Sequence, residues 1–292
     1  MEIAAFAPAK VNLYLHLIGV RADSYHLVDS LVAFADIGDR VTARESAALT
    51  LEIDGPQAAS LAGLGEDNLM LRAARLLAGH AGIAAHAALH LQKNLPVAAG
   101  IGGGSSDAAA ALRALCALWR VPVDEADLLR LGALLGADVP ACLHAGAAWI
   151  GGIGEQIEPE PSLPPAGIVL ANPQIALPTA AVFAARRGPF GDAGRFAPMP
   201  QDAAALAAVL EPLRNDLTNA AISIAPEIGW VLAALARLPG ALMARMSGSG
   251  ATCFALFADR LKAKRARAAI AKAEPGWWSA AGGFVAGERL SR

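Results

Sequence analysis

The sequence has few cysteines, and they form no recognisable motif. Cys116, Cys142 and Cys253 lie far apart in a chain of 292 residues, with no C-x-x-C pair and no spacing typical of a metal site. This pattern argues against a disulfide framework. It fits a protein of a reducing, cytoplasmic compartment.

An excess of either charge is also missing. The chain has 24 basic and 26 acidic residues, for a formal net charge of -2, which argues against a nucleic-acid partner. A local basic cluster at Lys262–Arg267 is interpreted as the solvated face of a helix. The N-terminus lacks the basic and apolar regions of a signal peptide. The uncharged stretch 161–185 holds five prolines, which argues against a membrane-spanning helix. We therefore expect a soluble protein, and the sequence leaves its oligomeric state open.

Hydrophobic residues make up 55% of the chain, and alanine is the most frequent of them. This is enough for a sizeable core in one large domain or two ordinary ones. Patterning predicts strands at Ile3–Ala7, Val11–Ile18, Leu27–Asp36 and Ala87–Leu91, a hairpin of Val41–Arg44 with Leu49–Ile53, and helices at Asn68–His80, after residue 107 and at Asp124–Leu135.

The second half repeats this mixture. We predict strands at Ile168–Ala171, Leu242–Met246, Cys253–Phe257 and Gly283–Val285, and helices at Thr179–Ala185, Asp202–Leu210, Glu227–Ala236 and Arg260–Ala273. The proline-rich segment Glu155–Pro165 is interpreted as a connection between domains. We therefore expect two α+β domains, at residues 1–158 and 159–292.

A glycine loop at Gly100–Ser106 is the most informative stretch. It leads into a helix, whose free N–H groups favour an anion. It contains no Gly-Lys-Ser/Thr, so it is not a Walker loop, and it misses the dinucleotide spacing G-x-G-x-x-G. Its serines can cap the helix or offer hydroxyls to phosphate or magnesium. Asp107 in the first helical turn must point away from a phosphate or face a cation. The alternative is a flexible turn.

Four other features have two interpretations each. Lys10, among apolar neighbours, is a functional cation or a surface lysine with a buried stem. Asp138 is a functional carboxylate or a helix cap. Met246–Phe254 is a ligand-facing loop or a tight hairpin. The pair Tyr25–His26 is a recognition element or loop packing.

Taken together, the motifs Pro8–Leu13, Pro96–Ala109 and Ser247–Cys253, with Gly136–Pro140 and Arg21–His26, resemble the GHMP kinase superfamily over nearly the whole chain. The similarity is strongest to its branch that phosphorylates a CDP-linked methylerythritol in isoprenoid precursor synthesis. The resemblance implies a two-domain GHMP kinase fold: an N-terminal domain with a left-handed βαβ unit and a ferredoxin-like C-terminal domain, with the active site between them.

The resemblance also implies ATP and Mg²⁺ as cofactors, the metal ligands being unknown, and a set of site residues. Asp138 matches the catalytic base, Lys10 a lysine that helps activate the hydroxyl, and Asn12 a residue near the acceptor. Tyr25 and His26 match residues that hold cytosine, and Thr179 and Phe183 the segment that closes the cytidine pocket. The predicted phosphate-binding residues are Pro96, Val97, Ala98, Ala99, Gly100, Ile101, Gly102, Gly103, Gly104, Ser105 and Ser106. Segment 187–200 shows no recognisable pattern.

Three rival functions remain at this point. Another GHMP kinase, acting on mevalonate, homoserine or a sugar, would have no use for Tyr25 and His26 as a pyrimidine site. A non-catalytic nucleotide-binding regulator would need neither Lys10 nor Asp138. An NAD-dependent oxidoreductase lacks its fingerprint.

Overall fold

The computed structural model describes residues 1–61, 63, 65–159 and 163–285, which form two compact units. The first unit comprises residues 1–9, 38–97 and 102–144. The second comprises residues 10–37 and 98–101 and the chain from residue 145 onward. Strands β1 (Glu2–Val20) and β2 (His26–Arg44) are long enough to pass through both. The predicted boundary between two family domains, after residue 158, stays a prediction.

A parallel β-α-β element organises the first unit. Strand β3 (Thr50–Asp54) pairs in parallel with β4 (Ala88–Gln92), and α1 (Leu69–Ala81) connects them, after the 3₁₀ turns η1 (Ala58–Leu61) and η2 (Gly65–Asp67). The end of β2 pairs antiparallel with the other edge of β4. The predicted hairpin was therefore wrong, because both of its strands pair with β4. The handedness of the β-α-β element stays a prediction.

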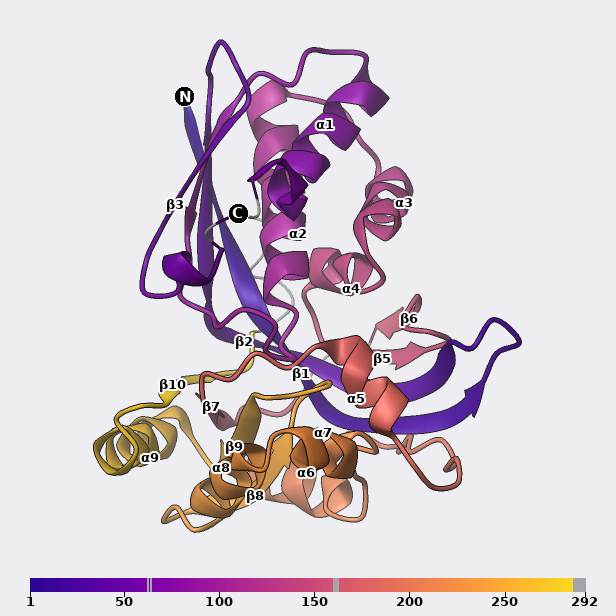
Figure 1. Ribbon diagram of the computed structural model, residues 1–292, viewed down its shortest axis with the longest axis vertical. Helices are drawn as coiled ribbons and strands as arrows, with labels where there is room; N and C mark the ends of the chain where they lie inside the picture. Colours follow the sequence, from indigo (N-terminus) through magenta and orange to yellow (C-terminus); the bar gives the residue numbers. More distant parts are fainter. Residues whose placement is uncertain (62, 64, 160–162, 286–292) are drawn as a thin grey trace. The chain divides into compact units, whose positions relative to one another are not determined.

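Among the described residues, four α-helices complete the first unit, and Figure 1 shows them. They are α1, α2 (Gly103–Trp119), α3 (Glu125–Leu135) and α4 (Val139–His144). Asn68 caps α1 by accepting a hydrogen bond from the Met70 N–H at 2.8 Å. Helix α2 packs against α1, α3 and α4. Half of its ten buried residues are alanines, which allow close approach of the neighbouring helices.

The second unit is built on an antiparallel sheet in the order β10-β7-β9-β8. Its strands are β7 (Gly167–Asn172), β8 (Ala241–Met246), β9 (Cys253–Phe257) and β10 (Trp278–Gly283). The two central strands, β7 and β9, are buried along their whole length. Four helices lie between β7 and β8 in sequence: α5 (Thr179–Ala185), α6 (Ala203–Leu210), α7 (Thr218–Ile224) and α8 (Glu227–Ala236). Helix α9 (Arg260–Ala273) follows β9. This order is the β-α-β-β-α-β pattern of ferredoxin-like folds, as expected.

Two further strands belong to the second unit. β5 (Ala148–Gly151) pairs with Ser30–Val32 of β2, and β6 (Gln156–Pro159) pairs with β5. The predicted connection Glu155–Pro165 therefore begins with a strand, while its residues 160–162 lie outside the described residues.

Most other predicted elements are confirmed. The bounds of α5, α8 and α9 agree with the prediction, while β1 and β2 are each one strand where we expected two segments. The last strand is displaced, because β10 ends at Gly283 where we expected it to begin. Helices α4 and α7 and strands β5 and β6 were missed. Over the described ranges, the helices include none that is long and apolar enough to cross a membrane.

Candidate active site

Lys10 lies on the part of β1 that belongs to the second unit. Its neighbours Val11, Leu13 and Tyr14 are fully buried, and Lys10 itself is only 7% exposed. Its backbone N–H donates to the carbonyl of Ile101 at 2.9 Å. A surface lysine is therefore excluded, and the short glycine-loop segment 98–101 is joined directly to the lysine-bearing strand.

The same loop segment is also joined to the second small-residue loop. The Ser247 hydroxyl donates to the Gly100 carbonyl at 3.0 Å, and the Thr252 N–H donates to the Ala99 carbonyl at 3.1 Å. A Cβ atom on Gly248, whose φ is +53°, would lie 2.6 Å from the Gly100 oxygen. Glycine is required here, because the two backbones touch. The sequence motifs gave no indication that these loops meet.

Asn12 is the next inward-facing polar residue of β1. Its backbone N–H donates to Ser247 Oγ at 3.1 Å, and its side-chain Nδ2 donates to Ser30 Oγ at 2.8 Å. Asn12 is 5% exposed, and its Oδ1 accepts no hydrogen bond from the described residues. The donor end of the amide is therefore held in place, while the acceptor end remains available for a hydroxyl or an N–H group.

Two further polar side chains hold the second small-residue loop. Asn215 Nδ2 donates to the carbonyls of Met246 and Gly248, both at 2.8 Å. Thr179, at the start of α5, shares a hydrogen bond of 2.9 Å with the Ser249 hydroxyl. Thr179 is thus brought to the same loop as Ser247, while its place in a cytidine pocket stays a prediction.

His26 and Phe183 come together within the second unit, although 156 other residues separate them in sequence. Their ring centroids are 5.2 Å apart with a 45° tilt, in the range of favourable aromatic pairs. Burial, and then the nearby charge of Arg186, lower the pKa of His26 below its usual 6.5. Tyr25, in contrast, is 60% exposed, and its stacking role stays a prediction.

The rest of the glycine loop belongs to the first unit. Gly102 adopts φ +65° and precedes α2, which has no side-chain cap at its N-terminus. The Ser106 hydroxyl donates to the Pro8 carbonyl at 2.8 Å. Ser106 therefore neither caps the helix nor points a free hydroxyl at a ligand. The Ser105 hydroxyl makes no hydrogen bond with the described residues.

A buried cation explains why Asp107 is tolerated beside this loop. Lys93 Nζ lies 2.6 Å from Asp107 Oδ2 and 2.7 Å from Asp39 Oδ2, and all three residues are at most 4% exposed. Burial, partly offset by Lys93, raises the pKa of Asp107 to about 7. Burial alone would lower the pKa of Lys93, but the two carboxylates outweigh it and raise that pKa. The expectation that Asp107 faces a cation is confirmed. Sequence reasoning missed Lys93 and Asp39.

Asp138 lies in the first unit, directly before α4. Its carbonyl accepts a hydrogen bond from the Cys142 N–H at 3.1 Å, and the residue is half-buried. The expected limited access of water is therefore present. Its pairing with Lys10 and its role as base stay predictions.

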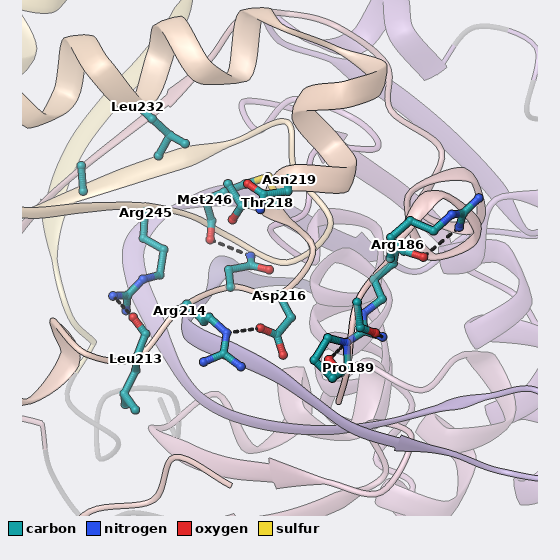
Figure 2. Close-up of a pocket in the computed structure, with 14 residues that line it drawn as sticks. Arg186, Pro189, Leu213, Arg214, Asp216, Thr218, Asn219, Leu232, Arg245 and Met246 are labelled. Carbon is teal, nitrogen blue, oxygen red and sulfur yellow. Dashed lines mark hydrogen bonds and ion pairs between the residues drawn. The ribbon is translucent and has the colours of Figure 1, made fainter. Parts of the chain in front are cut away.

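A basic pocket of about 500 Å³ is a feature that sequence reasoning did not find (Figure 2). The arginines that line it are Arg186, Arg187, Arg214 and Arg245. Arg245 donates to the carbonyls of Leu13, Leu210 and Leu213 at 2.6, 2.8 and 2.6 Å. Burial lowers its pKa to about 10. Arg245 therefore ties the strand next to Asn12 to the loop that follows α6.

No described part of the chain gathers three or more His, Cys, Asp or Glu residues as a metal site. Mg²⁺ is usually held by substrate phosphates, waters and one or two carboxylates. A Mg²⁺ ion that enters with a nucleotide therefore does not need a cluster of three protein ligands.

Comparison with known proteins agrees with this geometry. Residues 68–146 match the GHMP kinases N terminal domain, and residues 200–276 match the GHMP kinases C terminal domain. A homoserine kinase from Cytophaga hutchinsonii has the same fold, with a TM-score of 0.68 at 18% identity, covering 97% of this chain and 94% of that one. The two matched domains, the glycine loop and the sheet order define a protein of the GHMP kinase class.

Closer relatives narrow the assignment. 4-Diphosphocytidyl-2-C-methyl-D-erythritol kinase of Paramagnetospirillum magneticum is 52% identical over 274 residues, 94% of this chain and 95% of that protein. The same enzyme of Cereibacter sphaeroides (strain KD131) is 53% identical over 94% and 97%. A crystal structure of 4-(cytidine 5'-diphospho)-2C-methyl-D-erythritol kinase has a TM-score of 0.79 at 35% identity, over 97% and 99% of the two chains. The chain belongs to the family of 4-diphosphocytidyl-2-C-methyl-D-erythritol kinases.

Proposed function

We propose that the protein transfers the γ-phosphate of ATP to a hydroxyl of 4-diphosphocytidyl-2-C-methyl-D-erythritol, giving the 2-phosphate and ADP. This reaction belongs to the methylerythritol phosphate route to isoprenoid precursors. Relatives with this name match about 94% of the chain at 52–53% identity. The homoserine and mevalonate kinases with the same fold are only 18% and 10% identical, and likeness at that level supports the fold alone.

The observation that carries the proposal is the contact of His26 with Phe183. A cytosine offers a flat π-face and a polar edge, so its site needs an aromatic wall beside a hydrogen-bonding group. The pair supplies both at 5.2 Å. A small aliphatic acceptor such as homoserine or mevalonate has no use for this arrangement.

The remaining roles follow from what phosphoryl transfer requires, which is mainly positioning and charge neutralisation. The backbone N–H groups of residues 97–105 hold the nucleotide phosphates at the start of α2. Asn12 Oδ1, available in the second unit, accepts a hydrogen bond from the polyol part of the acceptor. Mg²⁺ bound to the ATP phosphates would neutralise charge on the transferred group.

The chemical step breaks the bond between the γ-phosphorus and the β–γ bridging oxygen, and forms one bond to the acceptor oxygen. Asp138 takes the hydroxyl proton, and the bridging oxygen leaves with ADP. Lys10 stabilises negative charge that develops on the acceptor oxygen.

An ADP-release assay tests the proposal. The purified protein should turn over ATP with the CDP-linked methylerythritol, and not with homoserine, mevalonate or galactose. His26→Ala should raise the KM for the CDP-linked acceptor and leave the KM for ATP within about two-fold, because the base contributes binding energy at this residue. Turnover of another acceptor in preference, or equal damage to both KM values, would contradict the proposal.

A further inference from the structure

The segment after α5, which shows no sequence motif, is held firmly to the strands of the second unit. The Gly191 N–H donates to the Leu17 carbonyl at 3.0 Å, and the Gly194 N–H donates to Asp29 Oδ2 at 2.7 Å. His16 Nδ1 lies 2.9 Å from the Asp192 carbonyl oxygen. These contacts fix residues 191–194 on β1 and β2, so the position of the preceding Phe190 is also defined.

Phe190 is a second aromatic neighbour of His26. The two ring centroids are 6.1 Å apart with a 59° tilt, while Phe183 lies 5.2 Å from the same imidazole. Phe183 comes from α5 and Phe190 from the loop after it. Two phenyl rings therefore contact one histidine, and a tilted geometry at these distances favours a defined ring orientation.

Arg186 supports Phe190 from the same loop. Its guanidinium carbon lies 4.6 Å from the centroid of the Phe190 ring, a cation–π contact. Its terminal nitrogens donate to the carbonyls of Gly188 and Pro189, which closes the turn (Figure 2). Arg186 Nε is buried and has no hydrogen-bond partner among the described residues.

Phe190 nevertheless stays open to a ligand. Its side chain is 41% exposed, unusual for a phenylalanine whose ring already contacts two other groups. Phe196, in the same loop, packs instead on Trp149, with the ring centroids 5.1 Å apart. The exposed ring is therefore the one beside the histidine.

We propose that Phe190, held by Arg186, is a specificity-determining residue of the acceptor site, which together with Phe183 fixes the His26 imidazole so that its edge reads the cytosine. This rests on the proposed function and adds two residues to it. An imidazole held by contacts with two rings presents one donor and one acceptor in defined directions. At the same ring position, cytosine has an amino group and uracil a carbonyl. The His26 edge can then pair correctly with only one of the two bases, because a mispaired buried polar group costs free energy.

The experiment compares Phe190→Leu and Phe190→Tyr with Phe196→Leu as the matched control. Steady-state KM values are measured for ATP and the CDP-linked acceptor, and CDP and UDP binding by calorimetry. Phe190→Leu should raise the acceptor KM roughly ten-fold with kcat and the KM for ATP nearly unchanged, and reduce the preference for CDP over UDP. Phe190→Tyr, which keeps the ring, should restore values near wild type.

The outcomes separate this inference from the proposed function. Wild-type turnover of the CDP-linked acceptor with an unchanged acceptor KM in Phe190→Leu would overturn the role of Phe190 alone. So would an equal rise in Phe196→Leu, because the loop would then act only through its stability. No turnover of that acceptor by the wild type would overturn the proposed function and this inference with it.

Discussion

Lys93 and Asp107 form an ion pair of 2.6 Å that is buried in the first unit, one residue after the serine pair of the glycine loop. Asp39 binds the same ammonium group at 2.7 Å. Two carboxylates thus share one lysine, so the cluster carries an excess negative charge when both are ionised. The change in folding stability on removing one of these carboxylate charges should therefore depend on pH.

Asp107→Asn should remove part of the pH dependence of stability. Burial raises the pKa of Asp107 to about 7 from an ordinary 3.8, so the folded protein keeps a proton that the unfolded chain releases. The stability from this proton is complete below about pH 4 and is lost as the pH rises through about 7. The amide in the variant does not titrate, so the variant does not lose this stability as the pH rises. The difference amounts to a few kcal/mol at most.

Thermal unfolding from pH 5 to pH 8 provides the measurement. The Tm of the wild type relative to Asp107→Asn should fall as the pH rises. Asp23→Asn, a change at an exposed loop carboxylate bound to Arg21 at 2.7 Å, is the control and should show no such trend. A wild-type advantage that stays constant or grows with pH would contradict the prediction.

Ser247→Ala should weaken the binding of both substrates, ATP and the acceptor. The Ser247 hydroxyl donates to the Gly100 carbonyl and accepts from the Asn12 N–H, so one group links the glycine loop to the strand of the acceptor residue. Its loss leaves two buried backbone groups unpaired, at a cost of about 1–3 kcal/mol for each such group. We expect a lower Tm and raised KM values for ATP and acceptor.

Ser223→Ala is the matched control for Ser247. Its hydroxyl donates to the Ala220 carbonyl at 2.7 Å within α7. Kinetics that are unchanged in Ser247→Ala, or equally changed in both variants, would show that the contact between the loops has no role in substrate binding.

Gly103→Val should weaken ATP binding while the fold is kept. A Cβ atom at Gly103 would lie 3.2 Å from Lys93 Nζ, closer than most real contacts, so the Lys93 ammonium group or the first turn of α2 must shift by a few tenths of an ångström. A displacement of this kind near bound phosphates costs roughly 10- to 100-fold in affinity. Gly79→Ala, in α1 with no atom within 4 Å of the new Cβ, is the control. Normal ATP affinity with a native circular dichroism spectrum would move the phosphate site elsewhere.

Local patterns predicted the helices better than the pairing of strands. The apolar period and Asn68 located α1 to within a residue, and α5, α8 and α9 have the expected bounds. Helix α7 was missed because it has only seven residues, and burial of Ala220 and Ala221 stabilises it rather than local propensity. The false hairpin arose because adjacent strands often pair, whereas β4, 34 residues beyond β3, lies between them.

Sequence motifs predicted the two loops of the site, but they did not predict contacts between residues that are far apart in the chain. The glycine loop and the small residues after Met246 are visible in sequence, but the hydrogen bond from Ser247 to Gly100 joins residues 147 positions apart. Asp107 drew attention as an acid beside a phosphate loop. Its partner Lys93 carried only a weak signal, a lysine at the end of an alternating strand.

Asp138→Asn tests the mechanism most directly. The amide keeps the shape of the carboxylate and some of its hydrogen bonding, but it cannot accept the hydroxyl proton. A positioned general base contributes about 10² to 10⁴ in rate. We expect kcat to fall by that factor with ATP binding nearly unchanged, measured at saturating substrates after single-turnover kinetics have shown that chemistry limits the rate. Asp127→Asn, at an exposed carboxylate of α3 in the same unit, should leave kcat unchanged.

Lys10→Ala completes this test, because the two residues are expected to act on the same hydroxyl. The single variant should lose a factor similar to that of Asp138→Asn. If both groups stabilise one transition state, the double variant should lose less than the product of the two factors, since removing the first already disables the second. Independent, multiplicative losses would mean that Lys10 and Asp138 serve separate steps. A kcat near wild type in Asp138→Asn would falsify its assignment as base, and catalysis would then rest on positioning and on the charge of Lys10.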